Sequence, residues 1–289
     1  MFVSGFTFIR NALKFDYPVV ESITSILPLC DEFIVALGNS EDATEGLIKS
    51  INSDKIKIIH TIWNEDLREG GKVLADETNK AFGAVSPLAD WAFYIQADEV
   101  VHEQYLDVIK ASMLKWKEHK EVEGLLLNYK HFYGSYDYVG DSRRWYRKEI
   151  RIIRNNNNIH SFRDAQGFRI QNKLLKVKST EAYMYHYGWV KPPEKQQDKQ
   201  KYFHKLWHND NWLEENIADV DTFDYSKIDS LSLYTGTHPE VMKERIKQKN
   251  WTFNFAPAQK KLCFKNKCLY LIEKTTGYRI GEYKNYRLV

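Results

Sequence analysis

The sequence predicts an α/β fold with a mostly parallel central sheet, and two observations lead to this prediction. Between residues 1 and 96, short apolar runs typical of buried strands alternate with stretches of helical spacing. Parallel strands need a crossover connection, usually a helix, so this alternation indicates βαβ units. The chain of 289 residues is 43% hydrophobic and 28% charged, a composition that supports a packed core and excludes wholesale disorder.

The N-terminal part is predicted to contain four strands and three helices. The strands are apolar and rich in β-branched or aromatic residues, whereas the helices place their apolar residues on one face. Right-handed crossovers bring the loops after successive parallel strands to one edge of the sheet, where α/β proteins form their ligand sites. The predicted strands are Phe2–Ile9, Glu32–Leu37, Lys55–His60 and Asp90–Gln96, and the predicted helices are Pro18–Leu27, Glu45–Ile51 and Gly71–Phe82.

Beyond residue 100 the regular alternation ends. Four consecutive asparagines at 155–158 predict a turn. Because no repeat and no flexible linker interrupts the chain, we expect one α/β domain over residues 1–190, with a helical, aromatic and basic extension over residues 191–289 packed on it. Further strands are predicted at Val122–Phe132, Glu149–Arg154 and Tyr183–Trp189, and further helices at Glu103–Glu118, Pro192–Trp212 and Pro239–Asn250.

Charge and cysteine content argue against several classes of protein. A net charge of +3 and a pI near 8.5 are too weakly basic to indicate nucleic-acid binding. Cys30, Cys263 and Cys268 form no CxxC pair, which disfavours a disulfide framework or a cysteine zinc site and fits a reducing cytosol. Neither a secretory signal nor an apolar run near the ~20 residues of a membrane span is found, so we expect a cytoplasmic protein.

Polar side chains follow two of the predicted strands. Ser40, Asp42 and Thr44 precede a helix, where such residues either cap the helix or leave its N–H groups free for an anion or nucleotide. After the fourth strand, Asp98 and Glu99 stand where a divalent cation could be held against a diphosphate. The alternative for this pair is that it begins the next helix, whose dipole favours acidic residues.

Four features in this order carry a family resemblance. They are Arg10-Asn11 at the end of the first strand, the Ser-x-Asp-x-Thr of residues 40–44, Asn79-Lys80-Ala81, and the run Asp90–Glu99. Together they resemble the family-2 glycosyltransferases of the GT-A fold, which use nucleotide-diphosphate sugars. The resemblance is good over residues 1–105 and thinner to about residue 190. It implies a GT-A domain that binds the nucleotide sugar and carries the catalytic residues.

The resemblance also implies a set of substrate-binding residues. Ser40, Asp42 and Thr44 would frame the nucleotide pocket, with the end of the first strand beside it. The predicted substrate-binding residues are Arg10, Asn11, Ser40, Asp42, Thr44, Asn79, Gln96 and Lys191.

A divalent cation, Mn²⁺ or Mg²⁺, is implied by the same family. Its later aspartate, here Asp98, commonly contacts the metal, and a downstream histidine, here His186, completes the site in some members; the alternative for His186 is a core or capping role. Two departures are visible. Leu37 stands where the family often has the aspartate that reads the base or ribose, and Gln96 replaces the first aspartate of Asp-x-Asp. The lost charge should weaken cation binding or reduce the need for metal.

Asp164 is the predicted catalytic base. An inverting transferase needs a carboxylate that takes the proton from the acceptor hydroxyl as it attacks the anomeric carbon. Asp164 lies in the polar, glycine-containing stretch Ser161–Phe168, roughly where family members keep this base. The alternative is an ordinary turn residue, and Glu181 and Asp141 are weaker candidates for the base.

Lys191, Lys195 and Lys199 follow one another at a spacing of four and predict a basic helix face. Such a face is usually solvated, although it could also contact phosphates or an anionic membrane surface. His204 and His208, also four apart, lack an HExxH pattern and are interpreted as structural or exposed. We expect the region from Lys191 onward to cover the acceptor side, or to contact a membrane or another subunit, rather than to form the nucleotide site.

The resulting hypothesis is a cytoplasmic, inverting glycosyltransferase, with a peripheral position at the inner face of the membrane as the alternative. It would transfer a sugar from a nucleotide-diphosphate donor to a glycan or lipid-linked acceptor in the synthesis of bacterial surface polysaccharide. Two rivals stay open. One is a catalytically silent protein that binds nucleotide sugars or glycans, and the other is an assembly protein that docks through its aromatic, basic tail.

Overall fold

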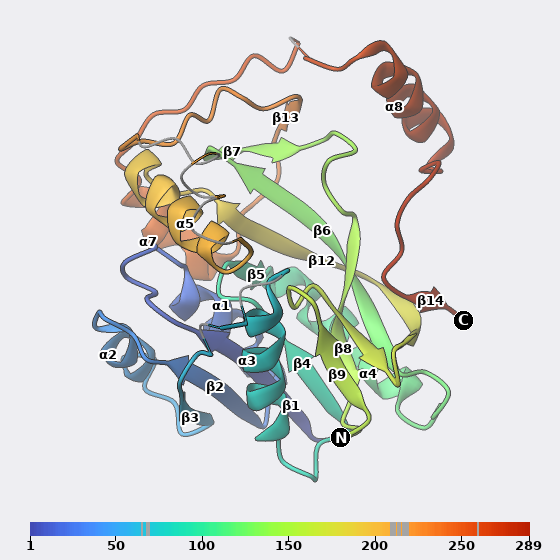
Figure 1. The fold of residues 1–289 in the computed structure, drawn as a ribbon. Coiled ribbons are helices and arrows are strands. Elements are labelled where there is room, and N and C mark those ends of the chain that lie inside the picture. Colours follow the sequence, from blue (N-terminus) through green and yellow to red (C-terminus); the bar gives the residue numbers. More distant parts are fainter. Residues whose placement is uncertain (65, 68–69, 209–211, 213–214, 216–219, 259) are drawn as a thin grey trace.

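The N-terminal residues form the parallel half of a large sheet (Figure 1). The structure is a computed structural model that describes residues 1–64, 66–67, 70–208, 212, 215, 220–258 and 260–289. Strands β1 (Val3–Ile9), β2 (Glu32–Gly38), β3 (Ile56–Thr61) and β4 (Trp91–Tyr94) pair in the order β3-β2-β1-β4, all parallel. The predicted α/β class and its four strands are confirmed, with boundaries shifted by at most two residues.

Helices cover both faces of this parallel sheet. On β2, Val35 and Leu37 pack in one apolar core together with helices α1, α2 and α4, whereas Ile34 and Ala36 pack in a second core with helix α3. Successive strand residues point to opposite faces, so a strand buried on both sides reads as a continuous apolar run. The bounds are α1 (Val19–Ile26), α2 (Thr44–Lys49), α3 (Lys72–Gly83) and α4 (Leu106–Trp116).

The C-terminal half of the sheet is largely antiparallel. It continues from β4 through β8, β6, β7 and β13, while β12 runs parallel to β6 and also pairs with β5 and β14. The bounds are β5 (Glu99–Val101), β6 (Gly124–Tyr133), β7 (Ser135–Gly140), β8 (Lys148–Arg154), β12 (Lys176–Trp189), β13 (Leu231–Leu233) and β14 (Arg287–Leu288).

Two local predictions are corrected here. Glu99 does not begin a helix but opens the buried strand β5, which pairs antiparallel with β12; a 3-10 helix over Glu103–Tyr105 and then α4 follow. The stretch Ser161–Phe168 is not simply a loop. It comprises the ends of β9 (Ile159–Phe162) and β10 (Gly167–Ile170), which form a small antiparallel sheet with β11 (Lys173–Leu174).

The chain after β12 is only partly helical. Helix α5 (Pro193–Lys205) is shorter than predicted, and residues 209–211 of the predicted helix lie outside the described part. The predicted helix near residue 240 is a 3-10 helix over Glu240–Met242 followed by α7 (Lys243–Lys247). Helix α8 (Phe264–Thr276), which was not predicted, lies at the periphery away from the sheet (Figure 1). Because the chain also returns to the sheet as β13 and β14, a domain boundary at residue 190 stays a prediction.

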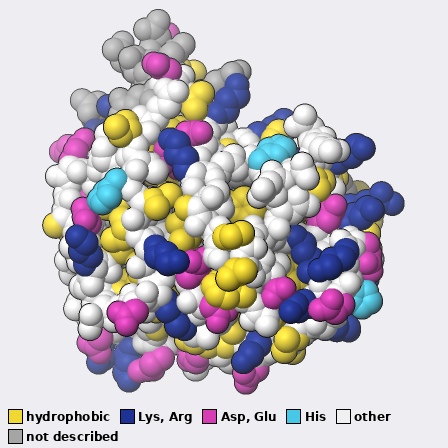
Figure 2. All heavy atoms as spheres, turned by 90° about the horizontal axis from the view of Figure 1, so that it is seen from below, with side chains coloured by type: hydrophobic (Ala, Val, Ile, Leu, Met, Phe, Trp, Pro, Cys, Tyr) yellow, Lys and Arg dark blue, Asp and Glu magenta, His cyan; other side chains and the backbone are white. Residues whose placement is uncertain are grey.

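The described part of the chain contains no helix that is long and apolar enough to cross a membrane. Figure 2 shows one face of the molecule, on which basic and acidic side chains alternate without a broad field of one sign. This mixed surface agrees with the small net charge of +3.

Candidate active site

A cleft of about 440 Å³ lies at the carboxyl ends of β1 and β4, and α5 supplies another of its walls. This is the edge of a parallel sheet at which α/β proteins form their ligand sites. Aromatic rings dominate the lining, so a planar base or a sugar ring would find stacking surfaces there. We call this cavity, with its aromatic and polar lining, the cleft. Its polar lining residues include Arg10, Gln96, Asp98, Asp164, His186 and Lys199.

Asp98 follows β4 and is a fixed negative charge in this cleft. Its Oδ2 accepts a hydrogen bond from Lys199 Nζ at 3.0 Å, and the same ammonium group donates to the Gly188 carbonyl at 3.1 Å. Burial acts to raise the pKa of Asp98, but the positive charge of Lys199 outweighs it and holds that pKa well below its usual range. The carboxylate and the ammonium group therefore form a charged pair that lines the cleft.

A pair of histidines stands beside Asp98. His131 Nε2 lies 2.8 Å from the Tyr146 carbonyl oxygen and must donate to it, so Nδ1 of the neutral ring accepts from His186 Nδ1 at 3.2 Å. Burial lowers the pKa of both imidazoles and favours these neutral forms. His186 Nε2 is then left with its lone pair, 3.7 Å from Asp98 Oδ1. The hydrogen bonds thus fix which nitrogen of His186 is available at the cleft.

Gly188 is required for this arrangement. A Cβ atom at this position would lie 2.7 Å from Asp98 Oδ2 and 2.8 Å from His186 Nε2. Real Cβ atoms do not approach other atoms so closely, so any larger residue must displace the carboxylate or the imidazole. The glycine of the His-Tyr-Gly-Trp stretch therefore serves a close approach between β12 and the loop after β4.

Glu99, the neighbour of Asp98, points away from the cleft and stabilises the fold. Its carboxylate is fully buried and receives two hydrogen bonds from the Arg151 guanidinium, both 2.8 Å, and one from the Tyr129 hydroxyl at 2.6 Å. Arg151 also donates to the Gln166 carbonyl at 3.1 Å, next to the turn that carries Asp164. Because its oxygens are occupied in this way, Glu99 supports the site without facing the cleft.

The predicted divalent cation can be tested against these donors. Asp98 Oδ1 and His186 Nε2 face the same space, and a carboxylate with an imidazole is a donor pair that Mn²⁺ accepts. Within the described residues, however, no group of three or more His, Cys, Asp or Glu side chains could hold a metal ion. Gln96 lines the cleft with a neutral amide and adds no second carboxylate beside Asp98. The two side chains fit a cation that takes most of its ligands from a bound substrate and water.

Asp164 lies in the turn between β9 and β10 and faces the cleft. The residues on either side, Arg163 and Ala165, adopt left-handed backbone conformations with φ of 56° and 61°. Such conformations cost non-glycine residues about 1–3 kcal/mol each and are concentrated at functional sites. Burial raises the pKa of the Asp164 carboxyl. A carboxylate with a raised pKa is a better proton acceptor than an ordinary aspartate.

Arg10 and Gln96 also line the cleft. The Arg10 guanidinium donates from Nε to the Asn39 carbonyl at 3.2 Å and lies over the rings of Trp63 and Tyr202, 5.7 and 5.9 Å from their centroids. The Gln96 side-chain nitrogen is 3.5 Å from the carbonyl oxygen of residue 165 and so reaches the Asp164 turn. The structure thus brings these two predicted residues together with Asp98, Asp164 and His186.

The other predicted nucleotide-binding loop lies outside the cleft. Ser40 Oγ, Thr44 Oγ1 and Asp42 Oδ2 accept hydrogen bonds from the backbone N–H groups at positions 11, 12 and 14, at 3.0, 2.8 and 2.7 Å. Asn11 Oδ1 in turn accepts from the N–H at position 41 at 2.7 Å. These four side chains join the loop after β2 to the loop after β1, and none of them lines the cleft.

Asn79 and Lys191 also have structural contacts and do not line the cleft. Asn79 Oδ1 accepts from the backbone N–H of Ser161 at 2.7 Å and so joins α3 to β9. Lys191 is fully buried, and its ammonium group donates to the Phe15 carbonyl at 2.7 Å. Burial lowers the pKa of this ammonium group well below its usual range.

Sequence reasoning missed the role of α5. The spacing of the lysines predicts a basic helix face that is usually solvated, yet Lys199 is turned into the cleft. Tyr202 and Leu206, three and seven residues later, line the same cleft, and this apolar stripe was the signal that the Lys199 face is buried. His204, expected to be structural or exposed, lines the cleft as well. His131 belongs to no sequence motif and is not among the predicted site residues.

No protein-family model matches the chain, and no curated protein matches it either. Among solved structures, it is similar to Staphylococcus aureus TarS, with 16% identity over 70% of this chain and 39% of that chain and a TM-score of 0.42. A shorter form of TarS gives 15% identity, 70% and 64% coverage, and the same TM-score. The chain is also similar to glucosyl-3-phosphoglycerate synthase of Mycobacterium tuberculosis, solved in complex with Mn²⁺, UDP and phosphoglyceric acid. The identity is 17% over 46% of this chain and 43% of that chain, and the TM-score is 0.30.

The chain spans less than two thirds of the length of these proteins.

Proposed function

We propose that the chain is an inverting glycosyltransferase that moves a sugar from a nucleotide-diphosphate donor to a hydroxyl group of a glycan or lipid-linked acceptor. The observation that carries this proposal is the pair of carboxylates in one cleft. The pKa of Asp98 is held low beside Lys199, whereas burial raises the pKa of Asp164. When two carboxyl groups have different pKa values, the one with the low pKa stays charged and stabilises charge, and the one with the raised pKa exchanges a proton. Acid–base enzymes use pairs of this kind.

Asp164 acts as the base in the proposed reaction. The acceptor oxygen attacks the anomeric carbon while the Asp164 carboxylate takes the hydroxyl proton. A bond forms between that oxygen and the anomeric carbon, and the bond from this carbon to the donor diphosphate breaks. The diphosphate leaves with the bonding electron pair. Attack from the side opposite the leaving group inverts the configuration.

Positive charge on the cleft wall would receive the diphosphate. Arg10 and Lys199 both line the cleft, and cations in a partly buried site stabilise phosphate groups more than they do in water. A divalent cation, if bound, would be held by Asp98 and His186 and would offset the charge of the leaving diphosphate. Stacked rings such as Phe15 and Tyr202, with centroids 4.8 Å apart, offer a surface for the base or the sugar.

The test is a thermal-shift screen of UDP-, GDP- and dTDP-sugars with and without Mn²⁺, followed by measurement of nucleoside diphosphate release. A donor at 100 times its Kd should stabilise the protein by about 2.7 kcal/mol. Release of the diphosphate with any acceptor, or by slow hydrolysis, supports the transferase. Absence of both stabilisation and release for every donor would contradict the proposal.

Gln96 favours one alternative, a protein that binds nucleotide sugars without turning them over. It places a neutral amide in the cleft where the family has a carboxylate, and Leu37 is an apolar core residue, 3% exposed, where the family often has an aspartate. Donor binding without any release of nucleoside diphosphate would support this alternative over the transferase. A setting in bacterial surface polysaccharide synthesis is a further proposal and rests on the family resemblance alone.

A further inference from the structure

A second cavity of about 370 Å³ shares Asp164 and Gln166 with the cleft. We call it the second cavity; its lining also includes Lys72, Phe162, Arg163, Trp207 and Tyr283. The proposed base therefore lines both the cleft and the second cavity. A base that takes a proton from one substrate while another substrate occupies the cleft needs this kind of placement.

Trp207 brings an aromatic ring next to the Asp164 turn. A Cβ atom added to Gly71 would lie 3.1 Å from both the Asp164 Cβ and the Trp207 ring, so the ring and the aspartate flank the same point. Gly71 has a φ of +70°, a conformation that glycine adopts without strain. Within the described residues the buried Trp207 Nε1 has no hydrogen-bond partner.

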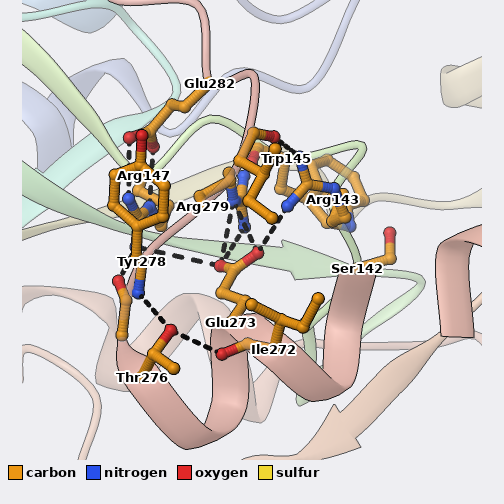
Figure 3. A network of polar contacts seen from close by, with 12 residues as sticks. Ser142, Arg143, Trp145, Arg147, Ile272, Glu273, Thr276, Tyr278, Arg279 and Glu282 are labelled. Atoms are coloured by element: carbon orange, nitrogen blue, oxygen red, sulfur yellow. Dashed lines mark hydrogen bonds and ion pairs between the residues drawn. The ribbon is translucent and has the colours of Figure 1, made fainter. Parts of the chain in front are cut away.

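Tyr283 reaches the second cavity from the C-terminal tail. Its side chain is 77% exposed, yet the chain is fixed on both sides of it. Before it, the Glu282 carboxylate makes two hydrogen bonds with the Arg147 guanidinium, both 2.7 Å (Figure 3). After it, Asn285 and Tyr286 are buried, 9% and 7% exposed. The ring of Tyr283 is therefore exposed to solvent on an anchored segment that lines the second cavity.

The same ion-pair network ties α8 to the body of the molecule. Glu273 receives hydrogen bonds from Arg143 at 3.2 Å and from Arg279 at 2.9 Å, and Arg279 also donates to the Trp145 carbonyl at 2.6 Å (Figure 3). The segment that leads to Tyr283 is thus anchored to the connection between β7 and β8. The anchoring reduces the conformational entropy that Tyr283 would lose on binding a ligand.

The charge of the second cavity is positive apart from Asp164. Lys72 and Arg163 line it, and the Arg163 guanidinium lies 5.1 Å from the centroid of the Phe162 ring. Flat aromatic faces suit the apolar face of a sugar ring, and a guanidinium group suits phosphate or carboxylate. The lining therefore combines a sugar surface with an anion-binding group beside the proposed base.

We propose that the second cavity is the acceptor subsite and that it takes a sugar bearing an anionic group, phosphate or carboxylate. This assignment rests on the proposed glycosyl transfer. Tyr283 and Trp207 hold the ring, Arg163 pairs with the anionic group, and the acceptor hydroxyl is presented to Asp164. The C-terminal tail is accordingly part of the substrate site.

The test measures binding of glucose 6-phosphate, glucuronate and glucose to the full chain by saturation-transfer NMR, with a nucleotide titration in parallel. We expect at least one of the two anionic sugars to bind roughly tenfold more tightly than glucose, the size of one charge-assisted contact. Comparison of glucose 6-phosphate with glucuronate shows which anionic group is preferred. Tyr283→Ala and Arg163→Gln should each weaken that binding about tenfold.

Matched controls are Tyr278→Ala, which removes another exposed tail tyrosine, and Arg287→Gln, which removes an exposed arginine of the tail; neither residue lines the second cavity. The controls should bind sugars and nucleotides like the parent chain. Equal binding of glucose and both anionic sugars, or equal losses in the controls, overturns the subsite while nucleotide binding stands. If no nucleotide binds to the parent chain, the proposed function fails and the subsite fails with it.

Discussion

The loops after β2 and β4 contain similar short polar residues and have different roles. After β2, the side chains of Ser40, Asp42 and Thr44 accept hydrogen bonds from the loop after β1. After β4, Asp98 points into the cleft and pairs with Lys199 from a distant helix. A side chain saturated by neighbouring backbone stabilises the fold, whereas one that meets charges from remote segments in a cavity can act on a substrate.

The largest expected effect tests the carboxylate that shares the cleft with Asp98. Asp164→Asn removes the proposed base and leaves the Asp98 pair untouched. Turnover should fall roughly 10²–10⁴-fold, the range for loss of a general base, while donor affinity is retained. Steady-state kinetics and donor titration measure the two quantities. Full transfer activity in the variant would show that the base is another group, with Glu181 and Asp141 next to be examined.

Asp98→Asn tests the loop after β4 directly. It removes the negative charge that faces Lys199 and His186, so donor and Mn²⁺ binding should both weaken, the donor by about 10–100-fold. Calorimetric titration of donor and Mn²⁺ measures these losses. The variant also leaves Lys199 without its anionic partner and should have a lower melting temperature, so the assays are carried out well below that temperature. Unchanged donor affinity would remove Asp98 from the donor site.

Gly188→Ala perturbs the same site without changing any charge. The added methyl group would lie within 2.8 Å of Asp98 and His186 and must push them apart. We expect donor affinity to fall about tenfold, with a modest loss of stability. Gly46→Ala is the matched control, because a Cβ atom there meets nothing within 4 Å. Equal behaviour of the two variants would mean that the packing around Gly188 is not part of the site.

Asp42→Ala separates the two loops. The sequence pattern predicts that nucleotide binding weakens by about 1–3 kcal/mol, the value of a charge-assisted hydrogen bond. The contacts of Asp42 with the N–H groups of Lys14 and Thr44 favour a different result, a loss of about 1–2 kcal/mol in unfolding free energy with little change in nucleotide affinity. Denaturant unfolding and nucleotide titration on the same protein decide between the two.

The smallest effect concerns the pH dependence of turnover. A base accepts a proton only when unprotonated, so turnover falls as the pH drops through its pKa. Burial raises the pKa of Asp164 above the usual value of about 3.9, and the loss should therefore begin at a higher pH than for an exposed aspartate. The acid limb should disappear in Asp164→Asn, measured on its residual activity. If the loss of turnover at low pH persists unchanged in that variant, it is caused by the protonation of a group other than Asp164.

The sequence by itself determined the parallel half of the fold. The runs Glu32–Leu37 and Asp90–Gln96 are apolar because their strands are buried on both faces, and this pattern can be recognised without knowledge of the tertiary structure. It also determined that polar residues follow these strands. It predicted Asp98, Asp164 and His186 as site residues, and the structure places all three in one cleft. Local hydrophobic periodicity is sufficient to predict the strands and helices, since elements of this kind are specified by residues close together in the chain, whereas Asp164 and His186 were predicted from the family resemblance.

Only the tertiary structure decided which polar residues face a common space. Ser40 and Asp98 look alike in sequence, yet one is satisfied by the adjacent loop and the other meets Lys199, about a hundred positions later in the chain. His131 and Tyr283 carried no local signal, because their contacts come from β12 and from the C-terminal tail. Contacts between residues far apart in sequence depend on how the elements pack, and no local pattern encodes them.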